Sequence, residues 1–233
     1  FSEEFKNIEN KDSEPMYYEN LPFRFDTRGI IYNKRGHVYK VNLGTSKFNK
    51  IVDGDKNHII SIGSLVESDK GVIFSYEKYN SKGTMLEEKV GSLETKKINE
   101  VHSKGSMGNL FYYEGELHAV GLRNRFDWPT NTAVLKLSSN GKVTFRHRTF
   151  DRNVVKAEVN NSVLYFLYED SGKTLLRDGT NNIDLIDAEV TVKDFAFNND
   201  KTYVIANSFS KPDEVYELNN GQLEKTSKAN EFF

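Results

Sequence analysis

The chain has 233 residues, enough for one ample domain or two small ones. Its net charge of −2 gives no overall reason to bind nucleic acid, and no stretch approaches the roughly 20 apolar residues of a membrane-spanning helix. The absence of cysteine excludes disulfides, thiolate nucleophiles and cysteine-based zinc sites. Aromatic residues make up 12% of the chain, which indicates a folded protein, and few apolar runs are long. Short, half-buried segments must therefore build the core, which favours β-structure.

In chain order, the sequence begins with a polar lead-in over residues 1–19, where SEEFKNIENK is the only short helical candidate. A pattern then recurs: a strand, a polar turn, a second strand rich in Tyr, Phe and Val, a variable loop, and a closing hairpin. Most hairpins carry Gly or Asn between their arms, as tight turns with positive φ require. The second strands begin at Gly29, Gly71, Glu116, Ser162 and Lys201. The unit therefore repeats every 39 to 46 residues.

Four antiparallel strands repeated at this period indicate a β-propeller. We predict a single all-β domain over 1–233, a five-bladed β-propeller of four-stranded antiparallel blades. The blades are expected at about 20–53, 58–102, 107–150, 153–189 and 192–228. The lead-in 1–19 is expected to return and pair with the last blade, which would close the ring and cover a sheet edge. The alternatives are a fragment of a larger propeller and an open β-sandwich.

The hairpin VYKVNLGTSKFNKIV resembles those of bacterial TolB-like propellers. There, a strand ending in an apolar–Tyr pair, a Gly turn and a Lys-rich outer strand close each blade. The resemblance covers about residues 20–228 and implies a fold, with no particular activity. Because the numbering begins at Phe1 without Met, we expect an upstream signal or lipoprotein anchor to have been removed. We therefore expect an extracytoplasmic bacterial protein, secreted or anchored at the cell surface.

The stretch RNRFDWPTNT is the longest loop between a second and a third strand, and it holds the only tryptophan. Trp128 offers a flat apolar face suited to stacking on a sugar ring or a side chain. Arg123 and Arg125 are suited to holding a carboxylate or phosphate. Phe126 and Asp127 complete the predicted ligand-binding set. In the alternative interpretation, Trp128 and Phe126 fold inward as a plug and Asp127 caps the turn.

Two weaker metal patterns occur. Asp53, Asp55 and Asn57 stand at alternate positions, which is the opening spacing of an oxygen-ligand calcium loop. The Gly and the later bidentate Glu of that motif are missing, and Asp and Asn also form ordinary turns. His58 and His102 enter successive blades at similar positions, but two histidines without a third ligand make a weak metal site. We therefore expect no metal and no cofactor.

The run KVTFRHRTFDR places Arg146 and Arg148 on one face of an outer strand. Charges on an edge strand commonly prevent aggregation between sheets. In the alternative interpretation, Arg146 and Arg148 form a basic patch with Arg123 and Arg125, and this patch binds an anionic polymer or a lipid headgroup.

A hydrolase would need two carboxyl groups about 5 to 10 Å apart, one of them protonated. The inner-strand candidates are Asp26, Glu67, Glu158 and Asp194. We favour a non-enzymatic propeller that binds a carbohydrate, an anionic polymer or a protein partner at one rim. The alternatives are a glycan-active hydrolase that uses these carboxylates, and an interaction domain of a larger envelope protein.

Overall fold

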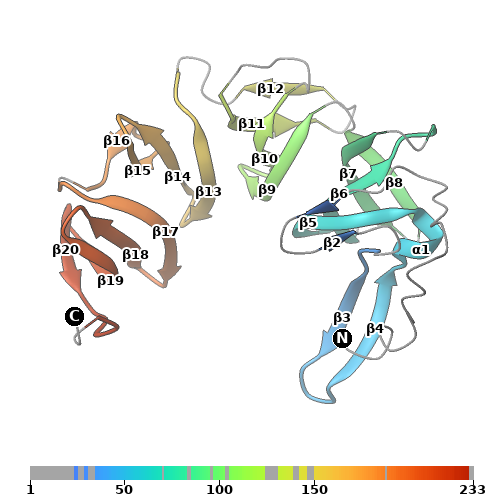
Figure 1. Ribbon diagram of the computed structural model, residues 1–233, viewed down its shortest axis with the longest axis horizontal. Helices are drawn as coiled ribbons and strands as arrows, with labels where there is room; N and C mark the ends of the chain where they lie inside the picture. Colours follow the sequence, from blue (N-terminus) through green and yellow to red (C-terminus); the bar gives the residue numbers. More distant parts are fainter. Residues whose placement is uncertain are drawn as a thin grey trace, which may run out of the picture.

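Four four-stranded antiparallel sheets follow one another in an arc (Figure 1). The computed structural model describes residues 24–25, 29–30, 35–69, 71–82, 85–94, 97–102, 105–123, 131–138, 142–145, 150–186 and 188–230. Within these ranges one helix occurs, α1 (Gly54–Asn57), and no helix is long and apolar enough to cross a membrane. The predicted closing segment 1–19 lies outside the described residues.

Each four-stranded sheet is built from four consecutive strands of the chain. Blade 2 comprises β5 (Ile59–Ser68), β6 (Gly71–Tyr79), β7 (Leu86–Glu94) and β8 (Lys97–His102). Blade 3 comprises β9 (Ser106–Tyr113), β10 (Glu116–Leu122), β11 (Ala133–Leu137) and β12 (Val143–Phe145). Blade 4 comprises β13 (Val154–Asn160), β14 (Val163–Asp170), β15 (Lys173–Asp178) and β16 (Ile183–Asp184). Blade 5 comprises β17 (Thr191–Asn198), β18 (Lys201–Ser208), β19 (Lys211–Asn219) and β20 (Gln222–Lys225).

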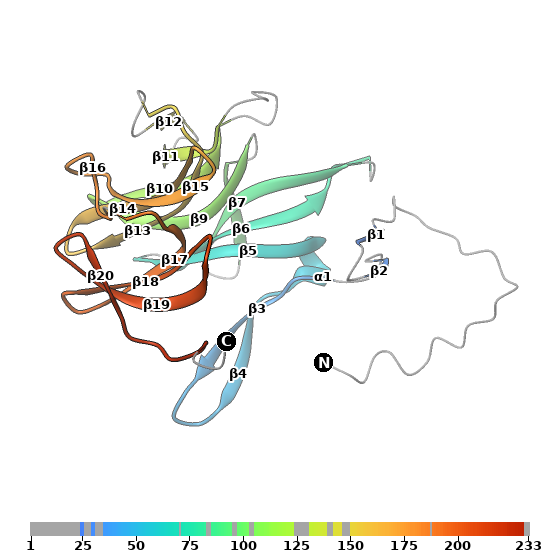
Figure 2. The same cartoon turned by 60° about the vertical axis from the view of Figure 1, so that its left-hand side comes forward.

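The first unit also has four strands, but they form two separate pairs. β1 (Arg24–Phe25) pairs with β2 (Gly29–Ile30), and β3 (Val38–Asn42) pairs with β4 (Lys47–Val52). The β3–β4 pair, called the first hairpin below, projects away from the arc (Figures 1 and 2). The predicted all-β propeller of five four-strand units is thus confirmed, with the first unit divided into two pairs instead of one sheet.

The second strand of a blade packs against both neighbours, because successive side chains of a strand point to opposite faces. Phe166 and Tyr168 of β14 belong to a buried cluster shared with Phe111 of blade 3. Leu167, between them in sequence, belongs to a cluster shared with Phe195 of blade 5. Burial on both faces explains why this segment is a continuous apolar run instead of an alternating one.

In blades 2 to 5 the pairing of the first strand with the second strand contains a break in register. The first strands concerned are β5, β9, β13 and β17. A bulge of this kind redirects side chains and frees backbone groups for other partners. The Leu110 amide donates to Ser64 Oγ at 2.7 Å, joining blades 3 and 2. The Ala157 amide donates to the side chain of Asn109, a residue with a φ of 43°, and this bond joins blades 4 and 3. Successive blades are therefore linked by polar bonds close to their bulges.

Candidate binding rim

Strand pairing places the start of each first strand beside the end of the second strand. Ile59 lies opposite Lys78 in blade 2, and Thr191 lies opposite Asn207 in blade 5. The loops that enter the blades and the loops between second and third strands therefore lie at the same end of the sheets. This end is called the entry rim below, and Arg123, one of the residues that the sequence singled out for ligand binding, lies there.

Of the predicted Trp-containing loop, the structure describes Arg123, while Arg125, Phe126, Asp127 and Trp128 lie outside the described residues. Arg123 is exposed, and its guanidinium carbon lies 5.4 Å from the centre of the Phe145 ring. A guanidinium over an aromatic face is attracted by the electron density of the ring. This contact joins the end of β10 to the end of β12.

The base of this loop is held by a close backbone contact. A Cβ atom at Gly105 would lie 1.9 Å from the Leu122 carbonyl oxygen and 2.9 Å from the Arg123 carbonyl carbon. Only glycine permits that approach. The chain entering blade 3 therefore lies directly against the residues from which the predicted binding loop begins. Arg146 and Arg148, the other members of the predicted basic patch, lie outside the described residues.

A second feature of the rim is the turn into blade 2, where Asp53 caps α1. The Asp53 side chain accepts a hydrogen bond from the Asp55 amide at 3.2 Å, and the Asn57 side-chain amide donates to the Asp53 carbonyl at 2.7 Å. His58 ends the helix in the left-handed conformation, with a φ of 55°. Asp53, Asp55 and Asn57 are thus used in forming this turn. Calcium binding by them was the weaker alternative to the expected absence of a metal, and these bonds account for the three residues without an ion.

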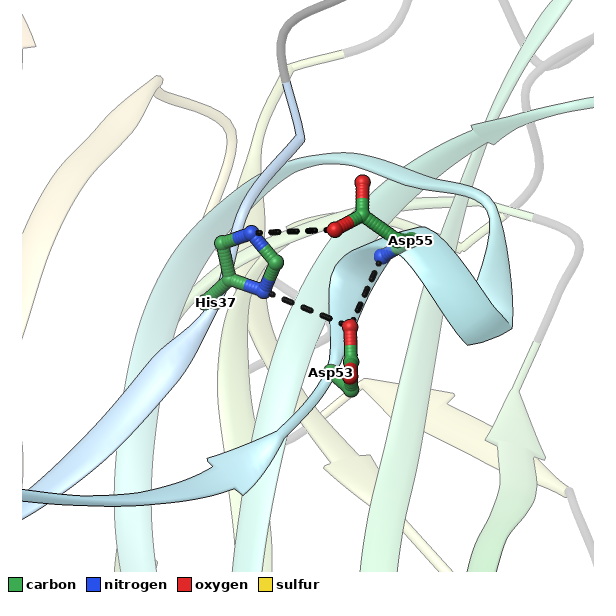
Figure 3. A group of neighbouring side chains, drawn as sticks. All are labelled: His37, Asp53 and Asp55. Carbon is green, nitrogen blue, oxygen red and sulfur yellow. Dashed lines mark hydrogen bonds and ion pairs between the residues drawn. The ribbon is translucent and has the colours of Figure 1, made fainter. Parts of the chain in front are cut away.

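The structure adds His37 to this turn, a neighbour that the linear spacing did not reveal. A Cβ at Gly54 would lie 2.1 Å from the Gly36 carbonyl oxygen, so two glycines allow residues 35–37 to cross the start of α1. His37 Nδ1 consequently lies 3.6 Å from Asp53 Oδ1, and its Nε2 lies 3.8 Å from Asp55 Oδ2 (Figure 3). The potential ligand atoms of the three side chains lie within 4.8 Å of one another.

The hydrogen bonding of His37 does not suit a metal ligand. The Gly54 amide donates to His37 Nδ1 at 3.0 Å, which uses the lone pair of that nitrogen. In the neutral ring the proton must then lie on Nε2, and this nitrogen faces Asp55. A metal on either nitrogen would have to displace the Gly54 bond or move the proton. The group is better explained as a hydrogen-bonded joint between the first hairpin and blade 2.

The two histidines of the weaker metal pattern have different surroundings. His58 is exposed at the end of α1, whereas His102 is buried at the end of the outer strand β8. His102 lies opposite Val90 in β7.

Of the three inner-strand carboxylates that the structure describes, two share one lysine and the third lies in another blade. Glu67 lies near the end of β5 that is remote from the entry rim, and Asp26 lies outside the described residues. Glu158 and Asp194 do come together, because Lys156 Nζ lies 3.6 Å from Glu158 Oε2 and 2.6 Å from Asp194 Oδ1. The ammonium also donates to the Phe195 carbonyl at 2.8 Å and lies 4.6 Å from the centre of the Phe195 ring. This arrangement is an ion-pair link between blades 4 and 5.

The described rim loops of blades 4 and 5 include ion pairs and an exposed aromatic residue. Arg152 Nε donates to Asp170 Oδ1 at 2.8 Å, and this hydrogen bond lowers the pKa of Asp170 below its usual value. Phe209, in the turn between β18 and β19, has a relative exposure of 110%. This loop joins the second and third strands of blade 5, the same connection that holds Trp128 in blade 3, and Phe209 was not among the predicted binding residues. The signal was a lone aromatic residue in the polar stretch SFSKPD.

No family model matches the sequence, and no curated protein matches it. Among solved structures, an acylaminoacyl peptidase of Pyrococcus horikoshii is 12% identical with a TM-score of 0.72. An acylaminoacyl peptidase in complex with Z-Gly-Gly-Phe-chloromethyl ketone is 13% identical with a TM-score of 0.74. Each comparison covers 95% of this chain and 35% of the peptidase. The β-propeller domain of the Trilobed protease from Pyrococcus furiosus is 12% identical over 83% of this chain and 76% of that one, with a TM-score of 0.49.

The likeness to the peptidases shows a common fold, because the identity is far too low to carry an activity. Together with the successive four-stranded sheets, it defines the chain as a β-propeller. The chain spans about a third of the length of the peptidases that it resembles.

Proposed function

We propose that this propeller is a non-enzymatic binding protein that holds an acidic carbohydrate at the entry rim of blade 3. Arg123 would bind the carboxylate of the sugar, and Trp128 would stack on the sugar ring. The observation that carries the proposal is the exposed Arg123 guanidinium over the Phe145 ring at the base of the predicted binding loop.

The geometry of Arg123 suits the recognition of a carboxylate. The N–H groups at the edge of a guanidinium form paired bonds with a carboxylate, while its contact with an aromatic ring, here at 5.4 Å from the Phe145 ring centre, uses no hydrogen bond. The tight contact of Gly105 with the end of β10 limits the movement of the loop base. A site that is already ordered loses less conformational entropy when a ligand binds.

The described inner-strand residues support binding over hydrolysis. Glycoside hydrolysis needs one protonated carboxyl group and a second carboxylate. Glu158 and Asp194 instead flank the Lys156 ammonium, and both form ion pairs with it. Asp194 Oδ1 also accepts the Phe195 amide at 2.8 Å, which ties it to its own strand.

A glycan array that includes neutral and uronate-containing oligosaccharides, with polyglutamate as an acidic non-sugar, would test the proposal. We expect wild-type protein to bind uronate-containing glycans and to bind them less well at high salt. Arg123→Ala is expected to weaken this binding about 10- to 100-fold, since hydrogen bonds to charged groups contribute about 1.5–3 kcal/mol. Trp128→Ala is expected to weaken it for neutral and acidic sugars alike.

Arg152→Ala is the matched control, because Arg152 is an arginine of the same rim in a different blade, where it donates to Asp170. It is expected to leave glycan binding within about twofold of wild type, a difference below roughly 0.5 kcal/mol. Binding that survives both Arg123→Ala and Trp128→Ala would refute the site. A preference for polyglutamate over every glycan would refute carbohydrate as the ligand class.

A further inference from the structure

We propose that the first hairpin docks on the outer face of blade 5 of the same chain and so closes the propeller ring. The inference is independent of the proposed carbohydrate site. It rests on an exposed apolar face of the first hairpin and a partly exposed one of blade 5, each of which repeats one half of the buried interface between blades 4 and 5.

The interface between blades 4 and 5 serves as the template. On the blade 4 side it contains Tyr165, Leu167 and Leu176, and both leucines are 1% exposed. On the blade 5 side, Tyr216, Leu218 and Leu223 of the outer strands pack against the same cluster. The outer hairpin of one blade therefore covers the preceding blade with one aromatic and two aliphatic side chains.

The first hairpin repeats this covering face in sequence and in register. Tyr216 lies opposite Lys225 and Leu218 opposite Leu223 in blade 5. In the first hairpin, Tyr39 lies opposite Lys50 and Val41 opposite Phe48. The matching residues are thus Tyr39, Val41 and Phe48, and they share one face because directly paired residues do so. Their exposures are 48%, 40% and 68%.

Blade 5 in turn repeats the face that blade 4 presents to its neighbour. The bulge lies beside Leu167 in blade 4 and beside Ile205 in blade 5. Leu167 pairs with Leu176, and Ile205 pairs with Val215. Tyr203, Ile205 and Val215 thus correspond to Tyr165, Leu167 and Leu176. Ile205 is nevertheless 38% exposed where Leu167 is 1% exposed.

The charged residues of the two faces allow one contact of opposite sign. Lys50 shares the face of Tyr39 and Phe48, whereas Lys40 and Lys47 lie on the other face of the first hairpin. On blade 5, Glu217 and Glu224 lie opposite each other on the face of Tyr203, and Lys201 already pairs with Glu217. An approach of Lys50 to Glu224 would favour one orientation of docking.

Docking within one chain is favoured by position. The first hairpin and blade 5 border the open side of the arc, on opposite sides of it (Figure 1). Two sites on one chain meet at an effective concentration on the order of millimolar. A two-stranded hairpin is also marginally stable in water unless another element covers it.

Cross-linking tests this contact cleanly because the natural chain has no cysteine. In the double variant Val41→Cys with Ile205→Cys, a short bismaleimide is expected to join the two thiols within one chain. The control is Val41→Cys with Val155→Cys, since Val155 is 50% exposed on β13 of blade 4. The product is identified by denaturing mass and by peptide mapping. We expect at least tenfold more of the internal cross-link in the first pair than in the control.

Hydrogen–deuterium exchange of cysteine-free protein provides a second measurement. Phe48→Glu places a charge in the proposed contact and is expected to speed amide exchange in residues 38–52 at least tenfold. Leu43→Glu, at a hairpin position that is 92% exposed, is expected to leave this exchange unchanged. A cross-link that joins two chains would assign the face to a second copy and overturn the proposal. Equal yields from the two cysteine pairs, or equal exchange in the two glutamate variants, would overturn it as well.

Discussion

The seam between blades 4 and 5 and the first hairpin use nearly the same side chains with opposite results. Tyr216, Leu218 and Leu223 pack against the core of blade 4, whereas Tyr39, Val41 and Phe48, at matching positions, are exposed. The local pairing is the same, since both hairpins join a Tyr–Lys pair to an apolar pair. The difference lies in the neighbouring sheet. Strand pattern therefore determines the hairpin, while burial depends on the partner that the rest of the chain supplies.

The largest loss of stability should come from removing a side chain that is buried between blades 4 and 5. Leu167→Ala is expected to lower the free energy of unfolding by about 2–5 kcal/mol, because it leaves a cavity between blades 4 and 5. Ile205→Ala, at the matching position of blade 5, should cost clearly less. Denaturant titration followed by circular dichroism measures both. Equal losses would show that Ile205 is as well covered in solution as Leu167.

A somewhat smaller effect is expected where the first hairpin joins blade 2. Gly54→Ala would place a Cβ atom 2.1 Å from the Gly36 carbonyl oxygen. Overpacking of this kind costs typically about 1–3 kcal/mol. Thermal unfolding should show the loss, and amide exchange should locate it around residues 35–58. Gly44→Ala is the control, since its nearest neighbour is the Asn42 side chain at 3.5 Å. If Gly54→Ala had the thermal unfolding and amide exchange of wild type, the close contact between Gly36 and Gly54 would contribute nothing to stability.

Blade 5 should respond to acid through Glu214, which is buried and lies opposite Ala206 in the strand ladder. Hydrogen bonds from Lys225 and Ser227 lower the pKa of Glu214 from its usual 4.5 to about 2. Because the folded pKa lies below the unfolded one, its stabilisation is present above about pH 4.5 and is lost as the pH falls toward 2.

Glu214→Gln should therefore reduce the stability of the protein at pH 6 and flatten the pH dependence between 4.5 and 2. Urea titrations at several pH values measure this. Glu224→Gln serves as the exposed control on the neighbouring strand. Parallel pH profiles for wild type and Glu214→Gln would contradict the assignment.

The smallest effect should come from the ion pairs of Lys156. Lys156→Met is expected to cost about 0.2–1 kcal/mol, because partly exposed pairs contribute little. The loss should shrink at high salt, where charges are screened. A double-mutant cycle that combines Lys156→Met with Asp194→Asn separates the free energy of the Lys156–Asp194 ion pair from that of the contact between Lys156 and the Phe195 ring. A salt-independent loss above that range would point to a packing role for the lysine stem.

Much of this fold could be predicted from periodicity and turn residues. The second strands and the closing hairpins were located correctly because alternation and positive-φ turns are local signals. The division of the first unit was not predictable, since its hairpin has the same pattern as that of blade 5. The bulges near Asn109 and Val155 have no sequence signal either, because they arise where a strand must bend against its neighbour.

The candidate rim shows the same limit. Asp53 and Asp55 were found by spacing, but His37 joins them only through the backbone contact between Gly36 and Gly54. Contacts between residues distant in sequence depend on tertiary structure. Glu158 and Asp194 were selected as possible acids, yet the decisive neighbour, Lys156, was not considered with them. The predicted role of Arg125, Phe126, Asp127 and Trp128 stays a prediction.

The polar bonds beside the bulges bear on how the molecule would respond to tension. Each bond joins a blade only to its immediate neighbour, as in a stack of repeats whose units interact pairwise. A force applied between the two chain ends would load these links one after another. Extension should proceed in steps of about one blade, and the first of these steps should be the release of β3–β4, which shares no sheet with another strand.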